Sequence, residues 1–175
     1  MTFLTAPPMA TMLVARGGDT LWSSMALACD ALSEGLKHTL DNLCAVHANV
    51  RKLGLGYENT APPEPSVDDY NNAEGTLHPA VIRHPETGRK CLCINGEYTI
   101  RFERWTRQES LGLLQFLLQH GQRPEFGVRF HWRPGSVAFW DNRQVWHLAV
   151  NDDRGMPRVM NRTVLKGTEP LPANA

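Results

Sequence analysis

The sequence has no excess of charge of either sign and no long apolar run. Its 175 residues include 18 basic and 18 acidic side chains, so the formal net charge is zero. A neutral chain offers no electrostatic basis for binding nucleic acid or a membrane surface. No apolar run approaches the roughly 18 to 20 residues that span a bilayer. We therefore expect neither a nucleic-acid partner nor a membrane partner.

Targeting signals and metal-binding cysteine patterns are also missing. The first eight residues have neither the basic start nor the apolar length of a signal peptide. The four cysteines (29, 44, 91 and 93) lack zinc-like spacing. Cys91 and Cys93 are two positions apart, which places both thiols on one face of a strand, where buried reduced cysteine is ordinary. These features predict a cytoplasmic protein without disulfides.

Short apolar runs separated by turn residues predict a mainly β domain. We expect strands at 9–16, 127–132, 136–140, 144–150 and 158–165, and a hairpin that joins 80–82 to 90–95 around Thr87-Gly88. Residues 17–20 (Gly-Gly-Asp-Thr) are typical of a turn. There are no internal repeats, and 175 residues suffice for one domain with its own core.

Helix signals lie between these strands. A helix is expected to begin near Ser23-Ser24. Another begins at Thr106, whose spacing from Glu109 makes a capping box, and ends near His120-Gly121. From Ser33 to Val50, apolar residues recur at helical spacing and predict one amphipathic stripe that includes His47 as a core or rim residue.

Two segments are predicted to lack regular structure. Residues 54–76 are rich in proline, glycine and polar side chains, which indicates either a lid or a slack surface loop. The tail at 168–175 is expected to be frayed. Short strands with helices packed on one side favour an α+β fold, a distorted jelly roll.

The chemistry-bearing residues gather near the end of the chain. His147 follows the motif Phe139-Trp140-Asp141-Asn142-Arg143, and Arg162 lies fifteen positions beyond His147 on the next predicted strand. Because strand side chains alternate sides, a turn between two strands can bring such a pair to one pocket. Imidazole binds divalent metals, and a guanidinium binds a carboxylate at two points.

This pattern resembles the taurine and chlorophenoxyacetate dioxygenase family. Its members are non-haem iron enzymes that hydroxylate a substrate carbon while they decarboxylate 2-oxoglutarate. The resemblance covers most of the chain through landmarks in family order, namely residues 2–4, 7–10, 17–22, 84–88, 134–136 and 140–143. It implies a double-stranded β-helix (jelly roll) fold, Fe(II) as cofactor, 2-oxoglutarate as co-substrate, and O2 with a small anionic substrate.

The resemblance also implies roles for single residues. His147 resembles the second iron-binding histidine. Arg162 resembles the arginine that binds the distal carboxylate of 2-oxoglutarate and faces the substrate, with Thr20 and Arg158 beside it on the co-substrate. Tyr98 stands where the family places an aromatic ring against the substrate. No catalytic residue beyond these is assigned.

One departure from the family pattern decides what to expect of this chain. The family's site needs a His-x-Asp pair together with the distal histidine. That pair would fall immediately upstream of Met1, so this chain resembles a family member truncated just after the motif, with a jelly roll incomplete at its N-terminus. Only His84-Pro85-Glu86 has His-x-acid spacing, and its turn formers favour a turn over a metal site.

Three hypotheses follow from this departure. The chain is part of an ordinary dioxygenase that acts on taurine, another sulfonate, an alkyl sulfate or an aryloxyacetate. Alternatively, it is a remnant without iron chemistry that binds 2-oxoglutarate or nothing, or a jelly-roll binding module. In each case we expect no iron turnover by this polypeptide alone. Unpaired sheet edges and an uncovered apolar face predict poor solubility or a homo-oligomer.

Overall fold

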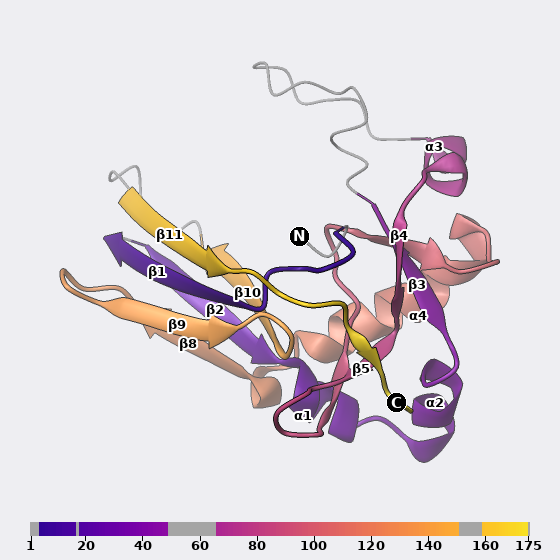
Figure 1. Ribbon diagram of the computed structural model, residues 1–175, viewed down its shortest axis with the longest axis horizontal. Coiled ribbons are helices and arrows are strands. Elements are labelled where there is room, and N and C mark those ends of the chain that lie inside the picture. Colours follow the sequence, from indigo (N-terminus) through magenta and orange to yellow (C-terminus); the bar gives the residue numbers. More distant parts are fainter. Residues whose placement is uncertain (1–3, 17, 49–65, 151–158, 175) are drawn as a thin grey trace.

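Two stacked β-sheets form one side of the molecule, and helices with shorter sheets form the other (Figure 1). The fold is taken from a computed structural model, which describes residues 4–16, 18–48, 66–150 and 159–174. Among these, no helix is long and apolar enough to cross a bilayer.

Each of the two stacked sheets has three antiparallel strands. In the first sheet, β1 (Ala10–Arg16) lies between β11 (Val159–Leu165) and β9 (Val137–Asp141). In the second sheet, β2 (Asp19–Ser24) lies between β10 (Val145–Val150) and β8 (Gly127–His131). Strands that follow one another in the chain alternate between the sheets, which is the topology of a jelly roll.

Aromatic side chains fill the space between the two sheets. Leu13, Trp132 and Trp140 are buried there, and Trp22 and Met160 pack against them. The Trp22 and Trp140 rings, from opposite sheets, meet edge to face with centroids 5.3 Å apart. Such aromatic pairs contribute about 0.5–1.5 kcal/mol each beyond the apolar area that they bury.

The remaining elements pack beside this sandwich. Their order along the chain is α1 (Met25–Asp30), α2 (Glu34–Leu40), β3 (Cys44–His47), α3 (Val67–Asn72), β4 (Thr76–Pro79), β5 (Val81–Arg83), β6 (Lys90–Leu92), β7 (Thr99–Phe102), α4 (Arg107–Gly121), a 3-10 turn (Pro124–Phe126) and β12 (Leu171–Pro172). They form two small sheets, β4-β3-β7 and β12-β5-β6. The main apolar core lies among them and includes Met25, Phe102 and Leu117, all fully buried.

Local sequence signals account for where helices α4 and α1 begin. The Thr106 hydroxyl accepts from the Glu109 amide at 3.2 Å, and the Glu109 carboxylate accepts from the Thr106 amide at 2.7 Å. This confirms the predicted capping box of α4. Helix α1 begins after Ser24, whose side chain caps it as predicted.

The expected hairpin and strands are also present. β5 pairs with β6 around a turn in which Gly88 has a φ of 69°. The four C-terminal strands lie within a residue or two of their predicted bounds. The mainly β jelly roll with helices is therefore confirmed.

Two sequence-based predictions of local structure are wrong in part. The helical stripe from Ser33 ends at Leu40, and residues 44–47 form the buried strand β3, because pairing with two neighbouring strands outweighs local helical spacing. Asp19 and Thr20 belong to β2 and not to the turn, which leaves Gly18, with a φ of 67°, to reverse the chain.

The two segments that we predicted to be irregular are more ordered than expected. Within 54–76, residues 67–72 form helix α3 with a Ser66–Asp69 capping box, and Thr76 begins β4; residues 54–65 lie outside the described part. In the tail, β12 pairs with β5, and Ala173 is fully buried with its carbonyl bonded to Arg83. Tertiary pairing therefore orders a tail that carries no strong local signal.

Apolar side chains remain exposed on the outer face of the first sheet. Met12 and Phe139 are paired neighbours on β1 and β9, and they are 40% and 65% exposed. Val137 and Leu165 on the same face are exposed as well. Exposed apolar surface of this kind favours association.

Candidate functional site

His147 and Arg162 both face the space between the two sheets. His147 on β10 is paired with Trp22, and Arg162 on β11 is paired with Leu13. Directly paired residues of antiparallel strands point to the same face. Trp22 and Leu13 both belong to the apolar cluster between the two sheets. The two sheets therefore place the predicted histidine and arginine on facing strands, where both side chains remain exposed to solvent.

The surroundings of His147 favour its neutral form. Part of the side chain is exposed to solvent, while its ring centroid lies 5.0 Å from that of Trp140. Burial by these neighbours lowers the pKa of His147, and the positive charge of nearby Arg162 lowers it further; Glu97 acts in the opposite direction. A neutral imidazole is the form that binds a metal ion.

Arg162 is exposed, and no described carboxylate forms an ion pair with it. Other arginines of the molecule do have acidic partners: Arg129 is bonded to Asp19 at 2.6 Å, and Arg143 to Asp141 at 2.6 Å. A guanidinium without an acidic partner among the described residues suits an external carboxylate, which it can hold at two points.

The other predicted site residues are Thr20, Tyr98 and Arg158, and their relation to His147 and Arg162 is less direct. Thr20 is almost fully buried on the inner face of β2, and its hydroxyl accepts a hydrogen bond from the Trp132 indole at 2.9 Å. Tyr98 is half-buried just before β7, next to Glu97, whose charge acts on His147. Arg158 lies outside the described residues.

The Trp-Asp-Asn-Arg motif builds the turn that leads into β10. The Asn142 side chain donates to the Thr11 hydroxyl at 2.8 Å and accepts from the Trp140 indole at 2.9 Å. Its backbone amide bonds to the Met9 carbonyl. The motif thus ties the end of β9 to the start of β1, a structural role that fixes where β10 and His147 begin.

Asp141 joins this turn to the β5–β6 hairpin through an ionic cluster. One of its carboxylate oxygens lies 2.9 Å from Nε2 of the buried His84, and Arg143 contacts the same carboxylate and Glu86. Burial alone would raise the pKa of Asp141, but hydrogen bonds from Arg143 and His84 hold it below the usual value. The sequence shows His84 and Glu86 in one motif and Asp141 and Arg143 in another, but spacing does not predict that the two motifs meet, because the contact is non-local.

The described residues do not complete an iron site around His147. The one group of three potential donors in the described part of the chain is His84, Glu86 and Asp141. Because Arg143 forms ion pairs with both carboxylates of this group, we interpret it as an ion-pair cluster rather than a metal site. Among the described residues, no group supplies the two further donors that a facial triad around His147 requires.

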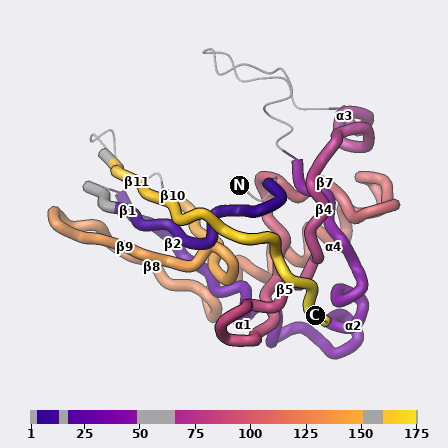
Figure 2. Tube along the Cα trace, viewed as in Figure 1, coloured from indigo at the N-terminus to yellow at the C-terminus, as the bar shows by residue number. Residues whose placement is uncertain are grey.

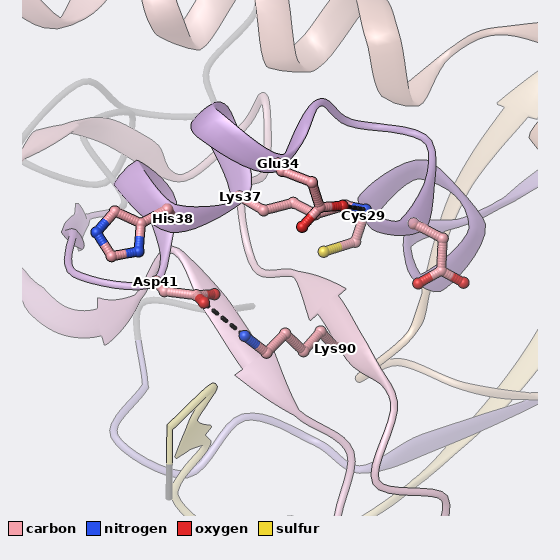
Figure 3. A pocket seen from close by; sticks show the side chains of 7 residues that line it. Cys29, Glu34, Lys37, His38, Asp41 and Lys90 are labelled. Carbon is pink, nitrogen blue, oxygen red and sulfur yellow. Dashed lines mark hydrogen bonds and ion pairs between the residues drawn. The ribbon is translucent and has the colours of Figure 1, made fainter.

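A surface pocket of about 350 Å³ lies away from this region, between α1, α2 and β6. Figure 3 shows Lys90 directed at Asp41 across its floor, with Glu34 and Lys37 beside Cys29. The charges pair with one another, and burial raises the pKa of the Cys29 thiol to about 11. A neutral thiol among paired charges has no evident chemistry, so the inner region of the sandwich remains the candidate site.

Comparison with known proteins identifies the family. The sequence profile described as "Taurine catabolism dioxygenase TauD, TfdA family" matches residues 1–164. The chain belongs to this family. The known relatives of the chain include dioxygenases described as dependent on alpha-ketoglutarate, another name for 2-oxoglutarate.

Two curated relatives and one crystal structure illustrate the match. The chain is 36% identical to an alkylsulfatase of Acinetobacter baylyi, over 95% of this chain and 55% of the relative. It is 33% identical to an alpha-ketoglutarate-dependent sulfate ester dioxygenase of Pseudomonas putida, over 98% and 59%. A taurine dioxygenase of Burkholderia xenovorans superimposes with a TM-score of 0.80 at 37% identity, over 99% and 57%. The chain thus spans somewhat more than half the length of the relatives that it matches.

Proposed function

We propose that this chain forms the co-substrate-binding part of a 2-oxoglutarate-dependent dioxygenase. Arg162 binds the distal carboxylate of 2-oxoglutarate, and His147 offers one metal ligand beside it. The observation that carries the proposal is the Arg162 guanidinium, which has no acidic partner among the described residues and lies close enough to lower the pKa of His147.

Further residues are assigned to the same site. The Thr20 hydroxyl, on the inner face of β2, contacts the co-substrate, and Arg158 assists Arg162. Tyr98, beside Glu97, contributes to the wall against the substrate. The aromatic cluster of Trp22 and Trp140 excludes water from the inner side of the site, which strengthens an ion pair between Arg162 and a bound carboxylate.

The proposed substrate of the whole enzyme is a small sulfate ester or sulfonate, hydroxylated with O2. This class is supported by the names of the alkylsulfatase and the sulfate ester dioxygenase that the chain resembles. Iron is the metal that the family implies, and it does not fit the donors described here, because no described residue joins His147 in a group of three donors. We therefore expect residues 1–175 alone to bind 2-oxoglutarate without turning it over.

Isothermal titration with 2-oxoglutarate tests the proposal. Arg162→Ala removes the bidentate contact, and charged hydrogen bonds contribute about 1.5–3 kcal/mol, so affinity should fall at least tenfold. Arg162→Lys keeps the charge but loses the planar fork and should bind with intermediate affinity.

Arg123→Ala is the matched control for this experiment. Arg123 is an exposed arginine paired with Glu125, outside the two stacked sheets, so its loss should leave 2-oxoglutarate binding unchanged. Equal binding by the wild type, Arg162→Ala and Arg123→Ala would exclude Arg162 as the carboxylate anchor. Decarboxylation of 2-oxoglutarate by the isolated chain with added Fe(II) would contradict the expected lack of turnover.

A further inference from the structure

Three tryptophans meet between the two stacked sheets, and one of their indole nitrogens differs from the other two. The Trp132 indole donates to the Thr20 hydroxyl at 2.9 Å, and the Trp140 indole donates to the Asn142 side chain at 2.9 Å. The Nε1 atom of Trp22 is buried, and no described residue accepts a hydrogen bond from it. The Trp22 ring packs against both others, with centroids 5.3 Å from Trp140 and 6.2 Å from Trp132.

A buried indole N–H without an acceptor is unfavourable. The indole has a single polar atom, which is a donor only, and buried tryptophan usually finds an acceptor for it. Arg83 and Arg101 also bury a nitrogen without a partner, but their other nitrogens donate to backbone carbonyls. Trp22 has no second polar atom that compensates in this way. Its N–H therefore indicates a place for an acceptor that the described residues do not supply.

Trp22 lies beside the residues assigned to the co-substrate. On β2 it is paired directly with His147 of β10, so the two side chains are neighbours on one face of the sheet. Thr20, two positions earlier on the same strand, shares that face. Arg162 lies on β11 of the other sheet, paired with Leu13 of the same apolar cluster. In Figure 2 the traces of β2, β10 and β11 all run within the sandwich.

We propose that the Trp22 indole donates a hydrogen bond to the 2-oxo acid end of bound 2-oxoglutarate. In the proposed function Arg162 holds the distal carboxylate, which leaves the other end of the molecule for the side of the site that carries His147 and Trp22. That end presents only oxygen acceptors, from its carboxylate and keto groups, and so matches a group that can only donate. This inference rests on the proposed function, because it assigns Trp22 to the same ligand.

Access to the indole nitrogen requires a neighbouring ring to move. The nitrogen has no contact with solvent, although the Trp22 side chain as a whole is half-buried. Phe130 of β8 meets the Trp22 ring edge to face, with centroids 5.9 Å apart, and is itself 36% exposed. Exposed side chains change rotamer within nanoseconds. We expect Phe130 to turn outward when the co-substrate enters.

NMR of the indole N–H groups tests the proposal on the intact chain. The five tryptophans give five indole resonances, which single Trp→Phe variants assign. Addition of 2-oxoglutarate should move the Trp22 indole proton downfield. The Trp132 and Trp140 protons should move less, because both are already hydrogen-bonded. Butyrate keeps one carboxylate but lacks the 2-oxo acid end, so it should leave the Trp22 resonance in place.

Titration calorimetry measures what the hydrogen bond contributes to binding. Trp22→Phe keeps an apolar ring and loses the N–H, so its affinity for 2-oxoglutarate should fall about tenfold, as expected for one hydrogen bond to a charged group. Trp105→Phe is the matched control. Trp105 is exposed and packs against Phe102, outside the two stacked sheets, and its variant should bind as the wild type does.

The outcomes separate this inference from the proposed function. Binding of 2-oxoglutarate with the Trp22 resonance unmoved, or equal affinity of Trp22→Phe and the wild type, overturns the role of Trp22 and leaves that of Arg162 intact. Equal movement with butyrate overturns the assignment to the 2-oxo acid end. Movement that persists in Arg162→Ala with unchanged affinity sustains Trp22 and rejects Arg162. An intact chain that binds no 2-oxoglutarate overturns both.

The test does not depend on the folding of one variant. The Trp22 resonance is followed in the wild type, and the other four Trp→Phe variants assign it by elimination. A folding defect in Trp22→Phe therefore leaves the spectroscopic result decisive.

Discussion

At the scale of single residues, Asp141 illustrates how a polar cluster positions a candidate ligand. Its carboxylate accepts from His84 and from Arg143, and the turn that it anchors leads into β10, which carries His147. Its side chain is 21% exposed, so these contacts are only partly screened by water. Loss of the Asp141 carboxylate should therefore affect the stability of the fold as well as the placement of His147.

Asp141→Asn tests this cluster through its pH dependence. The folded-state pKa of Asp141 is depressed, so its contribution is complete above the usual value of 3.8 and is lost as the pH falls through the lower folded-state pKa. Urea denaturation should show a loss of about 1.5–3 kcal/mol at pH 7 that shrinks below about pH 4. Glu74→Gln, a change at an exposed surface residue, should show no comparable loss, and a gap that persists unchanged at low pH would contradict the charge-based account.

At the scale of the elements, helix α4 shows two glycines with opposite roles. Gly121 is its last residue, as predicted, but it does not adopt a positive φ, so the helix does not end in a left-handed glycine. A Cβ at Gly121 would lie 2.6 Å from the Trp146 ring, which packs there from β10. Gly112, within the same helix, has no atom within 4 Å of such a Cβ.

The two alanine variants should therefore change stability in opposite directions. Gly121→Ala forces Trp146 to move and should cost about 1–3 kcal/mol. Gly112→Ala restricts the unfolded chain without a clash and should stabilise the fold by about 0.5–1 kcal/mol. Thermal denaturation of both variants measures the difference. Stabilisation by Gly121→Ala would mean that Trp146 does not pack closely on α4.

At the scale of the whole molecule, exposed apolar surface governs behaviour in solution. Met12, Val137 and Phe139 form a contiguous apolar patch on the outer face of the first sheet. We expect the isolated chain to self-associate through this patch. Replacing Val137 and Phe139 by threonine keeps β propensity and removes apolar area, so it should weaken association several-fold in sedimentation velocity.

Phe116→Gln provides the matched comparison for this patch. Phe116 is 48% exposed on α4, away from the sandwich, and its loss should leave association unchanged. Association that survives the double threonine change would place the contact elsewhere on the molecule.

Several elements of the fold can be predicted from local sequence. The Thr106 capping box, the Gly88 turn and the C-terminal strands depend on residues close together in the chain, so their signals are readable without a structure. The resemblance that names His147, Arg162 and Thr20 rests on motifs in order, and the profile match to residues 1–164 confirms the family. The roles of those residues, and of Tyr98 and Arg158, stay predictions.

By itself, then, the sequence determined the family, the strand-rich character and which residues are candidates for chemistry. These follow from residue type and short-range spacing. Only the tertiary structure decided that residues 44–47 form a strand, that Asp141 binds His84, and that the tail pairs with β5. It also decided the strand order of the two stacked sheets, in which β1 and β2 are the central strands among the described residues. Each of these outcomes depends on burial and pairing between segments far apart in the chain, and local propensities of well under 1 kcal/mol per residue do not specify them.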